Sequence, residues 1–410
     1  MPTKQILTST SRYRDQAHYH ITHKRRQAFY ALPQKHWQML SAPPFNILDR
    51  LNRIDDAIEK NAVIADAFVS SGVAMYDLEP PSAGQHYTHV QGHPFSTRPG
   101  SEWQGPVNPI DQEKAHSTVK QLYRDWSAEG AAERRACFEP VVNALNDEYT
   151  NIPIAQRGNV KVLVPGAGLG RSVFEINRAG YTVEGNEISY HQIIASNYML
   201  NFTTEAGQFE LHPWIHGFSN HLSRDDQLQM VRIPDVHPQT ALQSIASQTD
   251  VHPFERMSFS SADFCVAYKE EAEREAFNAV TTIFFIDTAP NVVNYVETVH
   301  NCLKKGGVWI NLGPLKWHFE NSTPSEKENE RANERKKGSA NERKKGSDNE
   351  GVGDPGSVEL TEEEVMALVQ ASGFVIEKHE TMHISTGYIG NAKSMWESVY
   401  HPSFWVARKQ

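Results

Sequence analysis

Residues 160–187 read Val160-Lys-Val-Leu-Val-Pro-Gly-Ala-Gly-Leu-Gly-Arg-Ser-Val-Phe-Glu-Ile-Asn-Arg-Ala-Gly-Tyr-Thr-Val-Glu-Gly-Asn-Glu187, and this stretch decides the fold. The apolar, β-branched run at 160–164 shows no alternation, which predicts a strand buried on both faces of a parallel sheet. The three glycines that follow allow a tight turn and leave no Cβ between the backbone and a ligand. A helix is expected from Arg171, then a second short strand at 181–184.

Glu187 completes this pattern, 21 residues after Gly166. Strand, glycine loop, helix, strand and acid in this order are typical of a nucleoside-binding βαβ unit. The carboxylate is then placed to accept hydrogen bonds from a ribose diol. A glycine-rich turn without a ligand is the alternative, and the surrounding strands and helix favour the nucleoside site.

Composition narrows the class of protein. The 410 residues carry a formal net charge of −10, which argues against a binder of duplex nucleic acid. Three cysteines without CxxC spacing predict reduced thiols and an intracellular protein. No apolar run approaches the 18 residues of a membrane span. We therefore expect a cytoplasmic protein, and the Lys/Arg clusters at 24–26, 335–337 and 343–345 leave a nuclear pool open.

The first 150 residues are predicted to be a helical region that covers the cofactor site. Residues 1–15 are polar and expected to be frayed, and the histidines from His18 to His23 lack the spacing of a zinc site, so a solvated helix face is expected there. Apolar residues at helical spacing predict an amphipathic helix pair over 46–70. Helices are expected at 111–126 and 131–150, with a long irregular connection at 78–110 between them and the pair.

Residues 151–320 are predicted to be the cofactor-binding core. The expected elements are a helix at 188–200, strands at 257–260, 279–286 and 308–312, and helices at 269–277 and 291–303. Residues 202–256 are too long for one crossover loop and predict an inserted lid or substrate element. Residues 321–357 contain a verbatim repeat of eight residues and almost nothing apolar, which predicts a disordered insertion. Residues 358–410 complete the core with a helix at 361–370 and strands at 374–379 and 404–408.

Acidic residues end three of the expected strands, at Glu187, Asp263 and Asp287. Open α/β sheets bind ligands at this carboxyl edge. The last two strands are close enough in sequence to pair as an antiparallel hairpin at the edge of the sheet. The predicted fold is thus α/β: the Rossmann-like sheet of class I methyltransferases with an antiparallel C-terminal hairpin, plus an N-terminal helical extension. One departure is Val164, where that class often carries an acid.

Longer motifs then make a resemblance specific. They are Gln121-Leu-Tyr-Arg124-Asp-Trp-Ser, Val162-Leu-Val-Pro-Gly-Ala-Gly-Leu-Gly-Arg171, Gly185-Asn-Glu187, Pro213-Trp-Ile-His216, Pro234-Asp-Val236, Phe284-Phe-Ile-Asp-Thr-Ala289, Trp309-Ile-Asn-Leu-Gly-Pro-Leu315 and His318-Phe-Glu320-Asn. With them the chain resembles the carnosine N-methyltransferases, which make anserine from the dipeptide β-alanyl-histidine. The resemblance runs from about residue 20 to the C-terminus, apart from the low-complexity insertion.

The resemblance implies S-adenosylmethionine as cofactor and carnosine as small-molecule substrate. It places the cofactor against the following positions, to which Gly168 of the same loop is added: Gln121, Arg124, Gly166, Glu187, Asp263, Phe264 and Ile283. In this arrangement Arg124 holds the methionine carboxylate, and Asp263 accepts from the adenine amino group with Phe264 beside the ring. An ordinary exposed helix face remains the alternative for Gln121 and Arg124.

The same resemblance places the imidazole against Asp287, His318, Tyr388 and Tyr400, with Asp287 and His318 as the catalytic pair. The imidazole is mostly neutral at cellular pH, so no strong base is needed. We expect Asp287 to accept a hydrogen bond from one ring N–H, which fixes the tautomer and stabilises the developing positive charge. The proton then leaves by way of His318 or solvent. A helix-capping role for Asp287 and a supporting role for His318 are the alternatives.

Three rival functions remain open from the sequence. The chain could methylate a histidine within a protein or peptide, could be a nicotinamide dehydrogenase, or could be a noncatalytic binding module that retains the fold. The expected terminal hairpin disfavours the dehydrogenase, and the three strand-end acids disfavour the binding module. No metal, nucleic acid or membrane partner is expected. The methylated nitrogen, the natural dipeptide and the oligomeric state, including a homodimer, are left open.

Overall fold

The computed structural model describes residues 2–78, 109–321 and 356–410, which divide into two compact units. The first unit contains residues 1–131, 194–237 and 389–398, and the second contains residues 132–193, 238–388 and 399–410. The division does not follow the predicted boundary at residue 150, and it splits the predicted insertion at 202–256 between the two units. Almost all of the predicted connection at 78–110 and of the low-complexity insertion at 321–357 lies outside the described residues.

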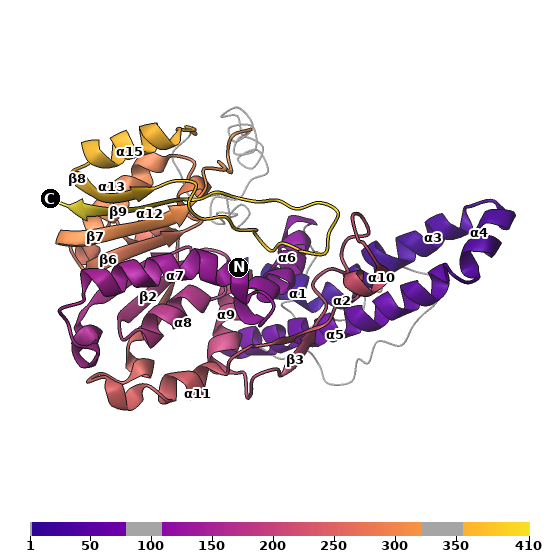
Figure 1. Ribbon diagram of the computed structural model, residues 1–410. Coiled ribbons are helices and arrows are strands. Elements are labelled where there is room, and N and C mark those ends of the chain that lie inside the picture. The colour runs from indigo at the N-terminus through magenta and orange to yellow at the C-terminus, as the bar shows by residue number, and fades with distance from the viewer. Residues whose placement is uncertain (1, 79–108, 322–355) are drawn as a thin grey trace, which may run out of the picture. The chain divides into compact units, whose positions relative to one another are not determined.

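The second unit is built on a seven-stranded sheet in the order β5-β2-β1-β6-β7-β9-β8 (Figure 1). The first five strands of this order are parallel, whereas β9 is antiparallel to both β7 and β8. The strands are β1 (Lys161–Pro165), β2 (Thr182–Glu187), β5 (Met257–Ser261), β6 (Phe277–Ile283), β7 (Leu303–Gly313), β8 (Phe374–Glu380) and β9 (Ser403–Lys409). This order confirms the predicted class I methyltransferase sheet and its antiparallel C-terminal hairpin.

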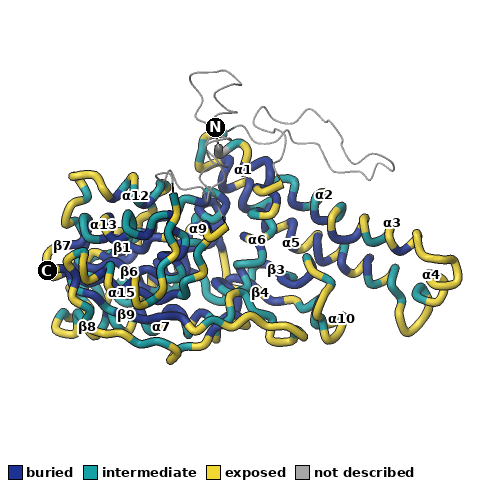
Figure 2. The backbone as a smooth tube through the Cα atoms, turned by 90° about the horizontal axis from the view of Figure 1, so that it is seen from above, coloured by how far each residue is buried: buried dark blue, intermediate teal, exposed yellow. Residues whose placement is uncertain are grey.

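Helices cover both faces of the sheet, because alternate strand residues point to opposite sides. Val162 and Val164 join one core with α7 (Ala131–Glu148) and α8 (Arg171–Arg178), whereas Leu163 joins a second core with α12, α13 and α15. The central strands are accordingly buried along most of their length (Figure 2). The helices of this second core are α12 (Phe264–Ala267), α13 (Val292–Cys302) and α15 (Glu362–Ala371), and α11 (Pro238–Gln243) lies earlier in the chain.

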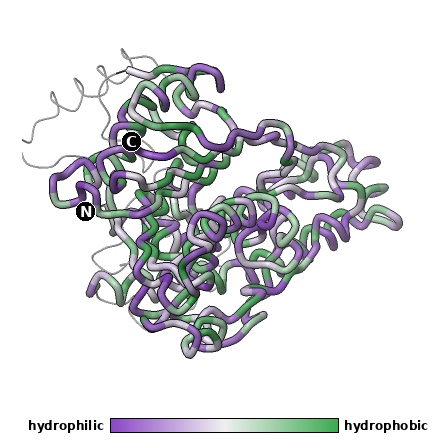
Figure 3. Tube along the Cα trace, turned by 60° about the vertical axis from the view of Figure 1, so that its left-hand side comes forward, coloured by the Kyte–Doolittle hydropathy of each residue, from purple (hydrophilic) through white to green (hydrophobic). Residues whose placement is uncertain are grey.

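The first unit is mainly helical and includes a two-stranded antiparallel sheet. Its helices are α1 (Pro2–Ser11), α2 (Tyr13–Ala17), the π-helix η1 (His18–His23), α3 (Lys24–Tyr30), α4 (Gln34–Ser41), α5 (Ile47–Met75), α6 (Pro109–Trp126) and α10 (Arg224–Gln227). Strands β3 (Phe209–Leu211) and β4 (Val231–Ile233) form the small sheet, and α9 (Tyr190–Asn201) runs from the second unit into the first. Hydrophobic segments occur in both units (Figure 3). None of the helices within the described ranges is long and apolar enough to cross a membrane.

Two predictions for the N-terminal region were wrong, and a third holds only in part. Pro2–Ser11 and Tyr13–Ala17 are helical rather than frayed, because Ile6, Leu7 and Tyr13 are buried. The predicted helix pair at 46–70 is one helix, α5, whose apolar spacing continues without a break. The predicted solvated helix face is confirmed for His20 and His23, which are exposed. His18 is half-buried instead: its Nδ1 and Nε2 lie 2.9 Å from Asp55 Oδ1 and 2.7 Å from Glu59 Oε1.

Three predictions in the core also need correction. The helix expected at 269–277 is absent; only a 3₁₀ turn at Glu271–Glu273 forms before Glu275 takes a left-handed φ of 54°. The strand expected at 279–286 ends at Ile283, because Phe284 has a φ of 52°. Strand β7 begins at Leu303 rather than 308, with Gly306 at a φ of 76° inside it. The helix expected at 361–370 is confirmed as α15, and Thr361 and Glu364 form its capping box.

A cluster of buried imidazoles lies in the core of the first unit. The Tyr13 hydroxyl lies 2.8 Å from His216 Nε2, and the His116 and His216 rings stack with centroids 5.1 Å apart. Asn61 donates to the Tyr13 hydroxyl and to the carbonyl of His212. Burial lowers the pKa of His116 to about 4 and the pKa of His216 to about 3. Both imidazoles are therefore neutral in the folded protein.

We expect the first unit to lose stability in mild acid. Below pH 6.5, roughly, the unfolded chain binds protons on both imidazoles while the folded chain does not, so the free energy of unfolding falls by up to about 1.4 kcal/mol per pH unit for each. His216→Gln should remove about half of this dependence between pH 6.5 and 5, measured by urea unfolding. The exposed His36→Gln is the matched control. An equal pH dependence in both variants would contradict the assignment.

Candidate functional site

The glycine loop after β1 has the conformation that its sequence requires. Gly166, Gly168 and Gly170 have φ values of 70°, 57° and 77°, a region that L-residues rarely adopt. A Cβ on Gly166 would also lie 2.5 Å from Cδ2 of Phe285. Glycine at 166 is therefore required by the backbone and by the space available, and the loop keeps its backbone open at the carboxyl edge of the sheet.

Glu187 lies at the end of β2 and is almost fully buried. Its Oε2 accepts a hydrogen bond from Gly168 N at 2.9 Å, and its Oε1 accepts from Ile188 N and Ser189 N at 2.9 and 2.8 Å. The structure thus brings together the two features that the sequence paired, the glycine loop and the acid. These three hydrogen bonds fix the carboxylate against the glycine loop at the carboxyl edge of the sheet.

Asp263 and Phe264 lie at the end of the neighbouring strand β5. Asp263 Oδ1 accepts from Val266 N at 3.1 Å and so caps α12. The Phe264 ring packs edge-on against Phe285 and Tyr295, with both centroid distances 5.5 Å, and only 4% of the residue is exposed. Phe264 is therefore mainly a core residue. Ile283, the last residue of β6, pairs with Leu312 of β7 at the same edge of the sheet.

Two phenylalanines that the sequence analysis did not single out organise the end of β6. Phe285 stacks on Tyr295 with ring centroids 4.8 Å apart and contacts the core that contains Leu163. Phe284 packs against the opposite core and contacts Tyr388 and Tyr400, with ring centroids 5.3 and 5.8 Å away. The doublet itself was visible in the sequence. The left-handed conformation of Phe284 could not be predicted, because phenylalanine has no preference for a positive φ.

Asp287 follows in a 3₁₀ turn (Ile286–Thr288) and is 4% exposed. Burial raises its pKa to about 6, although Lys316 N donates to Oδ2 at 3.0 Å. The alternative that Asp287 caps the next helix is wrong, because Asn291 caps α13 by accepting from Val293 N. A buried carboxylate of raised pKa that is not needed as a cap is typical of a functional group.

A backbone hydrogen bond joins His318 to Asp287. Its N–H donates to the Asp287 carbonyl at 3.0 Å, while the residue itself is exposed rather than a core histidine. Partial desolvation of the imidazole, together with nearby Lys316, lowers the pKa of His318. This side chain is therefore largely neutral at pH 7 and able to accept a proton.

Tyr388 and Tyr400 come from the long connection between β8 and β9. Thr386 N donates to the Tyr400 carbonyl at 3.0 Å, and Tyr400 N donates to the Thr386 carbonyl at 2.8 Å. The contacts of both rings with Phe284 place them at the end of β6, three residues from Asp287. The four predicted substrate residues of the second unit thus form two pairs, Asp287 with His318 and Tyr388 with Tyr400, and the segment Phe284–Asp287 connects the two pairs.

Gln121 and Arg124 belong to α6 of the first unit, so their shared site with the glycine loop stays a prediction. Arg124 Nε and Nη2 donate to the two carboxylate oxygens of Asp125 at 2.6 and 3.1 Å. Asp125 fixes the position of the guanidinium.

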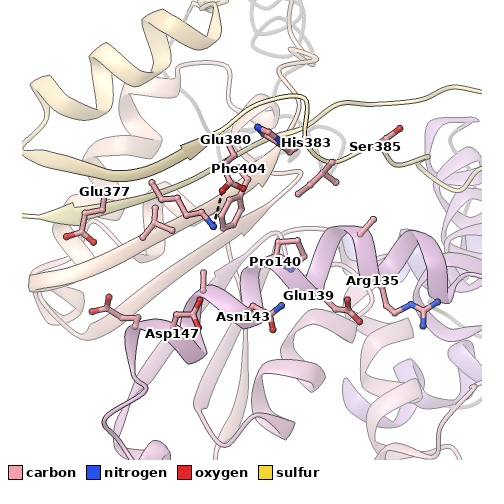
Figure 4. A pocket seen from close by; sticks show the side chains of 16 residues that line it. Arg135, Glu139, Pro140, Asn143, Asp147, Glu377, Glu380, His383, Ser385 and Phe404 are labelled. Atoms are coloured by element: carbon pink, nitrogen blue, oxygen red, sulfur yellow. Dashed lines mark ion pairs between the residues drawn. The ribbon is translucent and has the colours of Figure 1, made fainter.

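A separate groove of about 970 Å³ lies between α7 and the β8–β9 end of the sheet (Figure 4). Its walls carry carboxylates from Glu139, Asp147 and Glu380, and Glu380 pairs with Lys378 at 3.2 Å. None of the predicted site residues lines this groove. Within the described residues, no group of three or more His, Cys, Asp or Glu side chains is arranged to hold a metal ion.

Comparisons with known proteins identify the family of this chain. The sequence model of the family described as carnosine N-methyltransferase matches residues 101–410. The Schizosaccharomyces pombe carnosine N-methyltransferase is 35% identical over 99% of this chain and 95% of its own length. The Mus musculus carnosine N-methyltransferase is 32% identical over 99% of this chain and 85% of its own.

Among solved structures, the chain is similar to a magnesium protoporphyrin IX methyltransferase from Synechocystis, at 12% identity and a TM-score of 0.34. The similarity covers 75% of this chain and 90% of that one. The family assignment rests on three findings. The family model and the two relatives match most of the chain, and the sheet has the strand order of a class I methyltransferase. The chain belongs to the carnosine N-methyltransferase family and is a methyltransferase that depends on S-adenosylmethionine.

Proposed function

We propose that this enzyme transfers a methyl group from S-adenosylmethionine to the imidazole ring of carnosine, which gives anserine. The observation that carries the proposal is the buried carboxylate of Asp287, of raised pKa, three residues after Phe284, whose ring contacts Tyr388 and Tyr400. An imidazole is flat and has an N–H donor, so it matches a carboxylate beside aromatic rings. The family name of the relatives points to the same substrate.

The residues at the glycine loop fit S-adenosylmethionine. Gly166 and Gly168 leave no Cβ between the loop and a ligand, the carboxylate of Glu187 is bonded to the same loop and would accept from the ribose hydroxyls, and Asp263 lies at the next strand end. When bound, the cofactor supplies an electrophilic methyl group on sulfur. Arg124 would hold its methionine carboxylate, with Gln121 on the same helix as a further polar contact.

Asp287 is proposed to orient the substrate ring. Its carboxylate accepts a hydrogen bond from one ring N–H, so the other ring nitrogen presents its lone pair to the methyl carbon. The positive charge that develops on the ring is stabilised by the same carboxylate. The pKa of about 6 leaves Asp287 ionised at pH 7.5. The proton of the product can then leave by way of His318, which lies beside Asp287, or by solvent.

The aromatic wall adds selectivity for a ring that becomes cationic. The faces of Phe284, Tyr388 and Tyr400 attract positive charge, an interaction of about 0.5–2 kcal/mol for a partly desolvated cation. Because this attraction grows as the ring gains charge, it favours the transition state over the neutral ground state.

Asp287→Asn should lower kcat for carnosine by on the order of 10²-fold, equivalent to about 3 kcal/mol of barrier. Asparagine can still accept from Lys316 N, so the fold should persist and the affinity for S-adenosylmethionine should not change. The measurement is transfer of labelled methyl to carnosine, with cofactor binding followed by calorimetry.

Label transfer that ignores this substitution would refute the role of Asp287 but keep the enzyme. Tight cofactor binding with no transfer to carnosine would instead support a histidine in a protein or peptide as the acceptor. Transfer to a histidine-containing peptide in the same assay tests that outcome directly.

The pH profile should separate Asp287 from the substrate. Below pH 6 both the carboxylate of Asp287, with its pKa of about 6, and the carnosine imidazole take up protons, and either event blocks the reaction. The slope of log kcat/KM against pH should therefore approach 2 in the wild type and 1 in Asp287→Asn. Identical slopes in the two proteins would exclude titration of Asp287 from the mechanism.

Gly166→Ala should abolish binding of S-adenosylmethionine. The added Cβ would meet the Phe285 ring at 2.5 Å, and alanine is strained at a φ of 70°. Gly217→Ala is the matched control, because a Cβ there has nothing within 4 Å. Calorimetric titration with the cofactor distinguishes the variants, and wild-type affinity in Gly166→Ala would contradict the assigned loop.

A further inference from the structure

Three aromatic rings of the second unit, those of Phe264, Phe285 and Tyr295, contact one another, and we call them the aromatic triad. Phe285 and Tyr295 are stacked, with centroids 4.8 Å apart and ring planes at 17° to each other. The Phe264 ring meets both of them edge-on. Phe264 begins α12, Phe285 follows β6, and Tyr295 belongs to α13. The triad therefore joins three elements that are separate in the chain.

Phe285 connects the triad to the glycine loop. A Cβ on Gly166 would lie 2.5 Å from Cδ2 of Phe285, so this ring lies directly against the backbone of the loop. The stacked ring of Tyr295 is its other neighbour in the triad. Because protein interiors are close-packed, a ring that is held by one neighbour restrains the other. The position of the Tyr295 ring thus bears on the conformation of the loop.

The Tyr295 hydroxyl reaches the turn that carries Asp287. Thr288 Oγ1 donates to the Phe285 carbonyl at 2.6 Å, which uses the single proton of that hydroxyl. Tyr295, whose hydroxyl lies 3.3 Å from Thr288 Oγ1, is therefore the donor of the bond between them. Asp287 lies between Phe285 and Thr288 in the chain. The Tyr295 hydroxyl is thus bonded to the turn that contains the proposed catalytic carboxylate.

Tyr295 also lies within electrostatic reach of the predicted nucleoside residues. Burial raises the pKa of Tyr295, and the carboxylates of Asp263 and Glu187 act in the same direction. These are the two acids that are predicted to hold the adenine and the ribose. The hydroxyl therefore keeps its proton at neutral pH, as a donor to Thr288 requires.

We propose that Tyr295 is a positioning residue for both reactants of the methyl transfer. Its ring holds Phe285 against the glycine loop and so keeps the loop in the conformation that binds S-adenosylmethionine. Its hydroxyl holds the turn of Asp287 through Thr288. The inference rests on the proposed function, because it uses the glycine loop as the cofactor site and Asp287 as the group that orients the imidazole.

The ring and the hydroxyl act by different physical means. Without the ring, Phe285 can move into the vacated space, and the loop loses the neighbour that holds it. The cofactor must then order the loop again when it binds, which lowers its affinity. Without the hydroxyl, the aromatic ring still fills its space, but Asp287 is held less firmly. A small displacement of such a group slows the chemical step.

The role of the ring is tested with Tyr295→Leu, Tyr295→Phe and Tyr268→Leu. Phenylalanine keeps the stack, and Tyr268 is a buried tyrosine of the same core whose ring contacts Phe264 and Phe277. We expect the dissociation constant for S-adenosylmethionine, measured by calorimetry, to rise at least tenfold in Tyr295→Leu. It should stay within twofold of the wild type in the other two variants. Tyr295→Met, whose flexible side chain fills more of the space, replaces the leucine variant if that one does not fold.

Hydrogen exchange follows the loop in the absence of cofactor. The amides of Ala167 and Gly168 are hydrogen-bonded, each to an acceptor 2.9 Å away. Both should exchange at least tenfold faster in Tyr295→Leu than in Tyr295→Phe or Tyr268→Leu. Equal exchange in the three variants, or an equal rise of the dissociation constant in Tyr295→Leu and Tyr268→Leu, would overturn the role of the ring.

The role of the hydroxyl is tested with Tyr295→Phe, Thr288→Val and the double variant. We expect kcat for carnosine to fall at least threefold in each single variant, while the dissociation constant for S-adenosylmethionine stays that of the wild type. Because the two hydroxyls act through one bond, the double variant should be no slower than Thr288→Val. Additive losses, or a wild-type kcat in Tyr295→Phe, would overturn the role of the hydroxyl.

A failure of the proposed function gives a different result. If the wild type binds S-adenosylmethionine but methylates no carnosine, the proposed function fails, and the loop measurements still decide the role of the ring. The amide of Lys316, which donates to Asp287 Oδ2, then reports on the hydroxyl. It should exchange at least threefold faster in Tyr295→Phe than in the wild type. Unchanged exchange of this amide would refute the link between Tyr295 and the turn.

Discussion

The left-handed backbone of Phe284 is the constraint on which the site depends. It ends β6 at Ile283, and it separates two adjacent rings that pack into different cores. Phe285 fills the space beside Gly166 and thereby shapes the glycine loop, while Phe284 supports Tyr388 and Tyr400. The conformation of this one residue thus places one ring against the glycine loop and the other against Tyr388 and Tyr400, the two tyrosines of the proposed substrate site.

The carboxylates of Glu187 and Asp287 differ in their hydrogen-bond donors and in their burial. Glu187 accepts hydrogen bonds from three backbone N–H groups, which tie it to the glycine loop and to the residues that follow β2. Asp287 has fewer donors and deeper burial, which raises its pKa to about 6. The first is suited to hold neutral hydroxyls, and the second to respond to a proton on a ring of similar pKa. In the proposed mechanism the two carboxylates therefore have different roles, although both lie at the carboxyl edge of the sheet.

Much of the second unit could be predicted from sequence, because strong local signals agree there. The glycines at 166, 168 and 170, the apolar run at 160–164 and the Thr361 cap each specify their own conformation. The errors fall where distant contacts decide. The polar residues of α1 are helical because Ile6 and Leu7 are buried. The Glu-rich stretch at 269–277 has a high helix propensity, but the turn that leads into β6 prevents a helix there. Phe284 had no local signal, because a positive φ at phenylalanine is imposed by its surroundings.

The first unit is assembled from three stretches of chain, and the last of them, residues 389–398, lies far along the chain from the helices that it joins. During synthesis those helices leave the ribosome first, but the unit cannot be completed before residues 389–398 have been made. The sheet has the same property, because β9 is made after β7 and β8 and yet lies between them. Contacts between residues so far apart in sequence form slowly, so both units share a late step in folding.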